Sequence, residues 1–265
     1  MVQAPLAPVH LARVGRPWHW RTSCLYPFVT MKIQELTREL IESGGIDAIA
    51  ARDAPALRVL SDEERAASLR ATLDARPDGE AWLFAYGSLI WNPTVHAKEH
   101  RTARIEGWHR AFCLTTLIGR GTTDNPGLTL GLDEGGACHG IALRIDEAIL
   151  ERELSILWRR EMLSGAYVPR WLDVFDADGA RFGSAISFTI DRSSCQYAGG
   201  LTHAEIIRRL AHASGAIGSA ADYLFQTCAG LRSHGIPDPV LEALAVEVAA
   251  ARDETMIREA CGRTP

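Results

Sequence analysis

The sequence lacks long hydrophobic runs, blocks of basic residues and closely spaced cysteines. No apolar run approaches the roughly 18 residues that a membrane-spanning helix needs. The formal net charge is -5 and no basic block is present, so the electrostatic signature of a nucleic-acid binder is missing. The six cysteines form no C-x-x-C, which indicates free thiols in a reducing compartment. We therefore expect a soluble, cytoplasmic protein with no nucleic-acid or membrane partner and no obligate protein partner.

The first 30 residues also lack acidic side chains. They contain several arginines and prolines but no apolar segment of the kind that a signal peptide requires. One interpretation is a transit peptide, and the other is a disordered extension or an upstream start, because the segment from Met31 to Leu36 resembles a natural beginning. We favour the second. The chain is accordingly divided into a disordered extension at 1–30, a helical segment at 31–80 and a main domain at 81–255.

The main domain combines short strands with a few helices. Helical patterns precede it at 33–43 and 62–75, where Ser61 is a predicted N-cap with Glu64 as its capping-box partner. Turn residues such as Glu134-Gly135-Gly136 separate the predicted strands, which are 82–86, 104–116, 128–132, 139–145, 167–175 and 181–190. Further helices are predicted at 146–163, 202–214, 219–233 and 238–252. This irregular order predicts an α+β fold, with helices around a mainly antiparallel, barrel-like sheet.

The predicted helix at 146–163 places a carboxylate among apolar residues. Apolar side chains recur at helical spacing between Leu150 and Trp158, and Glu161 falls on the same face. Arg159 and Arg160 are expected at flanking or opposite positions. A carboxylate directed toward the core must be paired, hydrogen-bonded or neutral, and its pKa should rise unless a cation meets it. Glu161 is therefore either a catalytic candidate or a structural residue that reaches solvent or forms a buried ion pair.

A second candidate site follows the first predicted strand. The strand beginning at Leu83 runs into Gly87 and Ser88, where glycine allows a ligand to approach the backbone and N–H groups could bind an anion. An ordinary turn is the alternative. Tyr86 and Ile90 occupy the positions where a serine-hydrolase G-x-S-x-G motif needs glycine, which excludes that motif. A glycine-rich loop at 119–124 lacks the P-loop lysine but could still contact substrate.

A zinc site is the rival chemistry. His96, Glu99 and His100 match the H-x-x-E-H pattern, which on a helix would place two imidazoles on one face with the glutamate as general base. No apolar face anchors a helix here, so a solvated loop is the alternative.

Several motifs together resemble ChaC-type γ-glutamylcyclotransferases. The order and spacing agree from about Ser61 to about Ala250, although Ala85 and Ala166 stand where the family often has glycine. The matching motifs are Tyr86-Gly87-Ser88-Leu89-Ile90-Trp91, Gly107-Trp108-His109-Arg110, Gly119-Arg120-Gly121-Thr122, Leu157-Trp158-Arg159-Arg160-Glu161-Met162, Gly165-Ala166-Tyr167 and Tyr223-Leu224-Phe225.

The resemblance implies a small mixed, mainly antiparallel β-barrel with surrounding helices and a glutathione-specific lyase that forms pyroglutamate and Cys-Gly. It implies Glu161 as the catalytic acid and base, with no metal or other cofactor. The implied substrate-binding residues are Leu83, Phe84, Ala85, Tyr86, Gly87, Ser88, Leu89, Tyr167 and Tyr223. For this role Glu161 should point inward, have a raised pKa and remain unpaired by arginine. A non-catalytic module that binds γ-glutamyl ligands, and the zinc hydrolase, remain the alternatives.

Overall fold

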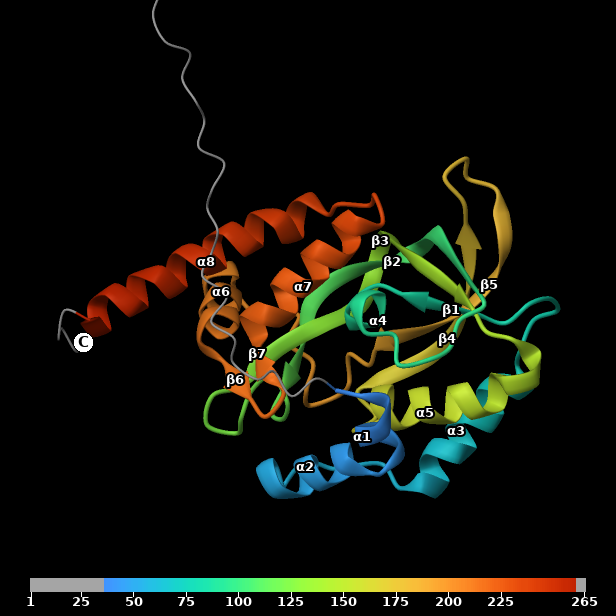
Figure 1. The fold of residues 1–265 in the computed structure, drawn as a ribbon, viewed down its shortest axis with the longest axis horizontal. Helices are drawn as coiled ribbons and strands as arrows, with labels where there is room; N and C mark the ends of the chain where they lie inside the picture. Colours follow the sequence, from blue (N-terminus) through green and yellow to red (C-terminus); the bar gives the residue numbers. More distant parts are fainter. Residues whose placement is uncertain (1–35, 261–265) are drawn as a thin grey trace, which may run out of the picture. The chain divides into compact units, whose positions relative to one another are not determined.

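Five strands close into a barrel in the computed structural model, which describes residues 36–260 (Figure 1). The strands are β1 (Trp82–Ala85), β2 (Glu99–Thr116), β3 (Gly127–Arg144), β4 (Tyr167–Phe175) and β5 (Arg181–Ile190). Neighbours in the order β1-β3-β2-β4-β5 are antiparallel, and β1 closes the barrel by pairing parallel to β5. The predicted mixed, mainly antiparallel barrel with surrounding helices is confirmed. The predicted extension at 1–30 lies outside the described residues.

Strand β1 is the most enclosed strand of the barrel. It pairs with β3 from Trp82 opposite Arg144 to Ala85 opposite Ile141, and with β5 on its other side. All four of its residues are buried, because a strand with neighbours on both edges and packed faces must be apolar throughout. The chain therefore leaves a fixed strand at Tyr86 and turns directly into the short helix α4 (Ser88–Trp91).

Strands β2 and β3 form one long antiparallel ribbon. The prediction that Glu134-Gly135-Gly136 divides 128–132 from 139–145 is wrong, because β3 continues through these residues. The register shifts between Glu106 and Trp108 on β2, opposite the two glycines, whose φ angles are 104° and 70°. Positive φ here bends a strand at a bulge instead of reversing the chain.

The helices before the barrel are α1 (Arg38–Glu42), α2 (Gly45–Asp53) and α3 (Asp62–Asp74). Gly44, with a φ angle of 74°, separates α1 from α2, which the sequence pattern did not predict. The predicted N-cap of α3 is confirmed, because Ser61 and Glu64 form both hydrogen bonds of a capping box. These helices belong to the same compact unit as the barrel.

The remaining helices form two groups around the barrel. A 3-10 turn, η1 (Glu147–Ile149), leads into α5 (Leu150–Glu161), which packs against α3 (Figure 1). Helices α6 (His203–His212) and α7 (Ala220–Ser233) contact β3, and α8 (Pro239–Ala260) packs on both. A two-residue ribbon of β6 (Ser214–Gly215) and β7 (Gly218–Ser219) joins α6 to α7. Within residues 36–260, no helix is long and apolar enough to cross a membrane.

Helix α5 is fixed to the barrel by its last apolar turn. Trp158 is 1% exposed and packs edge-on against Phe188 of β5, with the ring centroids 5.2 Å apart. Its indole N–H donates to Ser68 Oγ of α3 at 3.2 Å. Because Glu161 follows Trp158 by three residues, it lies on the same face of the helix, directed toward the barrel.

Candidate active site

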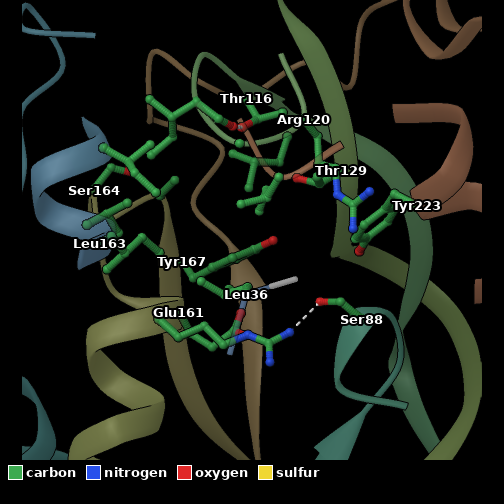
Figure 2. Close-up of a pocket in the computed structure, with 18 of the residues that line it drawn as sticks. Leu36, Ser88, Thr116, Arg120, Thr129, Glu161, Leu163, Ser164, Tyr167 and Tyr223 are labelled. Atoms are coloured by element: carbon green, nitrogen blue, oxygen red, sulfur yellow. Dashed lines mark hydrogen bonds and ion pairs between the residues drawn. The ribbon is translucent and has the colours of Figure 1, made fainter. Parts of the chain in front are cut away.

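A pocket lies beside the last turn of α5 (Figure 2). Ser88, Glu161, Tyr167 and Tyr223 all line it, although they come from four elements far apart in the sequence. Sequence reasoning missed other polar residues of the lining, namely Asn92, Thr116, Thr129, Arg160, Ser164, Gln196 and Gln226. Gly119 and Arg120 of the glycine-rich loop also line the pocket.

Six of the predicted binding residues do not line this pocket: Leu83, Phe84, Ala85, Tyr86, Gly87 and Leu89. Three of them form the buried wall of β1, and Leu89 is 5% exposed. The Tyr86 hydroxyl donates to the Phe188 carbonyl at 2.8 Å, which ties the end of β1 to β5. In the structure the segment 83–89 therefore supports Ser88 from behind the pocket. A direct role of its other residues in substrate binding stays a prediction.

Glu161 lies inward, as its position in the sequence indicates, with 12% of its side chain exposed. Burial raises the pKa of its carboxyl, and the charge and hydrogen bond of Arg160 lower it by a smaller amount. The expectation that Glu161 is unpaired is wrong, because Arg160 Nε lies 2.9 Å from its Oε1. Desolvation still outweighs this ion pair, so the carboxyl holds a proton more readily than an exposed glutamate does.

Arg160 joins Glu161 to the loop that follows β1. Its side chain is 4% exposed, which contradicts the flanking or opposite position that helical spacing predicted. One terminal nitrogen donates to Ser88 Oγ at 2.7 Å, which is the contact drawn to Ser88 in Figure 2. The other donates to the Asn92 carbonyl and, at 3.0 Å, to Thr94 Oγ1. Arg160 thereby holds Ser88 and Glu161 in fixed positions relative to each other.

Two tyrosines, Tyr167 and Tyr223, line the pocket together with Glu161. Tyr167 donates to the Leu130 carbonyl at 2.7 Å, and Tyr223 forms hydrogen bonds with Ser88 and with the Leu130 backbone. Burial first, and the nearby Glu161 charge in addition, raise the pKa of Tyr86, Tyr167 and Tyr223. All three therefore stay neutral near pH 7 and act as hydrogen-bonding hydroxyl groups.

Arg120 brings a second guanidinium to the pocket lining. It is 6% exposed and donates to the Ser219 carbonyl at 3.2 Å. Its guanidinium lies 5.8 Å from the Trp91 ring and 6.0 Å from the Tyr223 ring, a geometry that favours cation–π attraction. The motif Gly119-Arg120-Gly121-Thr122 was the one signal in the sequence that pointed to this loop.

Gly87 provides a test of the packing behind the pocket. A Cβ at this position would lie 2.8 Å from the Tyr223 hydroxyl oxygen. We expect Gly87→Ala to displace Tyr223, to lower kcat/KM at least about tenfold, and to destabilise the fold by about 1–3 kcal/mol through overpacking. Steady-state kinetics and urea unfolding measure these two effects.

The control for Gly87→Ala is a double-mutant cycle with Tyr223→Phe, which removes the oxygen that the new methyl group meets. The stability loss should be smaller in the Tyr223→Phe background than in the native one. Equal losses in both backgrounds would show that the close contact with Tyr223 is not the cause.

The raised pKa of Glu161 also predicts a pH-dependent stability. A carboxyl whose folded pKa lies above its ordinary value of 4.5 contributes stability fully below that pH, and this contribution is lost as the pH rises through the folded pKa. Because glutamine resembles the protonated carboxyl, Glu161→Gln should melt at a higher temperature than the native protein at about pH 7.5. Calorimetry should find this difference gone at about pH 4, and an identical difference at both pH values would contradict the raised pKa.

His96, Glu99 and His100 do not form the zinc site that the H-x-x-E-H pattern predicts. Glu99 and His100 lie on strand β2 instead of a helix, so neighbouring side chains point to opposite faces. Glu99 is held by Arg101 at 2.9 Å and by Arg144 at 3.0 Å, and His96 is exposed. Nowhere in the described part of the chain do three His, Cys, Asp or Glu side chains group so that they could hold a metal ion.

The five-stranded barrel with its surrounding helices is a γ-glutamylcyclotransferase fold. A solved γ-glutamyl cyclotransferase specific to glutathione, from yeast, superposes with a TM-score of 0.58 at 22% identity, covering 66% of this chain and 98% of that one. At this identity the superposition shows the fold alone. The ChaC-like protein family model matches residues 81–251, and this chain belongs to that family.

Relatives of known name agree with this membership. The glutathione-specific γ-glutamylcyclotransferase of Escherichia coli is 47% identical over 190 residues, which are 71% of this chain and 81% of the relative. The γ-glutamylcyclotransferase 2-1 of Arabidopsis thaliana is 33% identical over 55% of this chain and 71% of its own. The glutathione-specific γ-glutamylcyclotransferase 1 of Danio rerio is 28% identical over 57% of this chain and 79% of its own.

Proposed function

We propose that this protein is a glutathione-specific γ-glutamylcyclotransferase, a lyase that degrades glutathione to pyroglutamate and Cys-Gly. The observation that carries the proposal is an inward carboxyl with a raised pKa, that of Glu161, in the pocket of a ChaC-like chain. The identity with the Escherichia coli relative supports glutathione as the substrate. We assign catalysis to residues 81–255, which contain the matched family region.

The reaction needs only groups that the substrate and Glu161 supply. The α-amine of the glutamyl unit attacks its own γ-carbonyl, so a new C–N bond closes a five-membered lactam. The amide bond to cysteine then breaks, and Cys-Gly leaves as an amine. Because the nucleophile and the electrophile share one molecule, the protein has to hold the curled conformer and transfer protons from the attacking nitrogen to the leaving nitrogen.

Glu161 carries these protons. The ammonium nitrogen loses two protons as it becomes the lactam N–H, and the leaving nitrogen gains two as it becomes the ammonium group of Cys-Gly. Glu161 accepts protons from the first nitrogen and returns them to the second, so no net proton, water or cofactor is consumed. An α-amino pKa near ~8 against an ordinary glutamate pKa near ~4.3 makes the first transfer uphill by roughly 5 kcal/mol. Burial of Glu161 raises its pKa and thus reduces this difference.

Ser88 and the two tyrosines Tyr167 and Tyr223 hold the glutamyl group in this proposal. They present neutral hydroxyls to the pocket that contains Glu161, and the charge of Arg160 beside Ser88 favours an anionic substrate carboxylate. The segment 83–89 contributes by holding Ser88 in place. We further propose that the protein works in the cytoplasm, which the free thiols of Cys113, Cys138, Cys195 and Cys228 support.

Incubation of the purified protein with glutathione tests the proposal. Chromatography should find equal amounts of pyroglutamate and Cys-Gly, with the rate unchanged by a metal chelator. Binding without products would indicate a non-catalytic module. Activity lost on chelation and restored by zinc would indicate a metal-dependent hydrolase.

A further inference from the structure

One side of the pocket is apolar and comes from residues before the family match. Four aliphatic side chains line it, and we call them the N-terminal wall: Leu36, Ile46, Ile49 and Leu57. They precede residue 81, where the family model begins. Ile46 packs with Leu163 and Ile118 in a separate apolar cluster, and Leu163 and Ile118 also line the pocket.

The segment that carries this wall is fastened to elements around the pocket. Arg38 binds Glu153 of α5 through two contacts of 2.6 and 2.8 Å, and Glu153 is only 1% exposed. The Asn92 side chain donates to the Leu36 carbonyl at 3.0 Å. Asn92 lies in the loop after α4, and its own carbonyl accepts a hydrogen bond from Arg160. These bonds, made by buried or half-buried groups, fix the start of the segment against α5 and the loop after α4.

Two more contacts fix the end of the segment. The Leu60 N–H donates to the Leu163 carbonyl at 2.8 Å, just after α5. Thr123 Oγ1 donates to the Asp53 carbonyl at 3.0 Å, from the glycine-rich loop. The wall is therefore attached at both ends to segments that border the pocket.

Part of the apolar lining lies across the pocket from Ser88 and Tyr223. In Figure 2, Leu163, which packs with Ile46 of the wall, lies on the side opposite these two residues, whereas Leu36 lies between Glu161 and Ser88. The glutamyl amine and γ-carbonyl must lie near Glu161, with the polar groups of Ser88 and Tyr223 around the glutamyl unit. The residue that follows the scissile bond is then directed to the apolar side.

We propose that the N-terminal wall selects the leaving amine of the substrate. It favours γ-glutamyl amides whose next residue has an uncharged side chain of low polarity, such as the thiol of cysteine, since a charged group placed there would lose its hydration without a partner. This inference rests on the proposed function and assigns the choice of leaving group to residues 36–57.

Truncation of the wall tests this inference. Ile49 and Leu57 are half-buried, so Ile49→Ala and Leu57→Ala should leave the fold intact. The control is Val59→Ala, because Val59 belongs to the same apolar cluster but does not line the pocket. We expect KM for glutathione to rise roughly five- to tenfold in each wall variant with kcat nearly unchanged, because the lost apolar contact is the same in the ground and transition states. The Val59→Ala protein should behave as the native one.

Inhibition by γ-glutamylglycine gives a comparison with glutathione. The residue that follows its γ-glutamyl group is glycine, which has no side chain for the wall to contact. Its inhibition constant against glutathione should be the same, within about twofold, in the native protein and in both wall variants. The inference is overturned if γ-glutamylglycine weakens as much as glutathione, if only kcat falls, if Val59→Ala has the same effect, or if an active native enzyme is unaffected by either truncation. A native protein that forms no pyroglutamate from glutathione would refute the proposed function and this inference with it.

Discussion

Replacing Glu161 with glutamine is expected to reduce kcat for glutathione by about 10³-fold or more, with little change in the KM. Glutamine keeps the size of the side chain and its place at the end of α5 but cannot accept the ammonium proton. General acid–base groups typically contribute 10²–10⁴-fold, and here one group performs both transfers. The effect is measured as the rate of pyroglutamate formation, which mass spectrometry monitors under single-turnover conditions.

The matched control for Glu161→Gln is Glu151→Gln. Glu151 lies on the same helix but is exposed. This variant should retain native turnover. Near-native activity of Glu161→Gln, or equal losses in the two variants, would remove Glu161 from the mechanism.

Replacing Arg160 with methionine is expected to lower kcat/KM by about 10²-fold and to alter its pH dependence. Arg160 contacts Glu161 and Ser88 together, and small misplacements of reacting groups can cost that much. Arg160 lowers the pKa of Glu161, so its removal raises that pKa further. Since the unprotonated carboxylate accepts the proton, the acidic limb of the pH–rate profile should move to higher pH.

Two further variants separate positioning by Arg160 from a general structural effect. Arg160→Lys restores the charge with fewer hydrogen bonds, so it should return the acidic limb toward its native position and recover part of the rate. Arg159→Met, next in the chain, removes only a 3.3 Å contact with Asp62 and should be nearly silent. An unshifted profile in Arg160→Met would contradict the role of Arg160.

Local patterns in the sequence predicted most of the elements. The capping box at Ser61 and the strand at 181–190 depend on neighbours in the chain, and both are confirmed. The two glycines at 135 and 136 were misread because positive φ suits a turn and a bulge equally well, and only the partner strand β2 decides between them. Helix α2 was missed because its buried face consists of only Ile46 and Ala50.

The sequence predicts a site residue correctly when the periodicity of its own helix determines which way its side chain points. Helical spacing from Trp158 was enough to direct Glu161 inward. Arg160 was misplaced because its partners Ser88 and Asn92 lie 72 and 68 residues away, and no local pattern indicates a buried cation whose partners are so distant. The N-terminal wall was equally invisible, because Ile49 and Leu57 resemble ordinary core residues until the pocket brings them together.

In the proposed mechanism the glutamyl amine, and not water, attacks the γ-carbonyl. The most direct test is to run the reaction with glutathione in water enriched in ¹⁸O and to analyse the products by mass spectrometry. Cyclisation predicts pyroglutamate without ¹⁸O from the solvent, formed in equal amount with Cys-Gly. Glutamate that carries one ¹⁸O atom in its γ-carboxyl group would show hydrolysis and would contradict the mechanism.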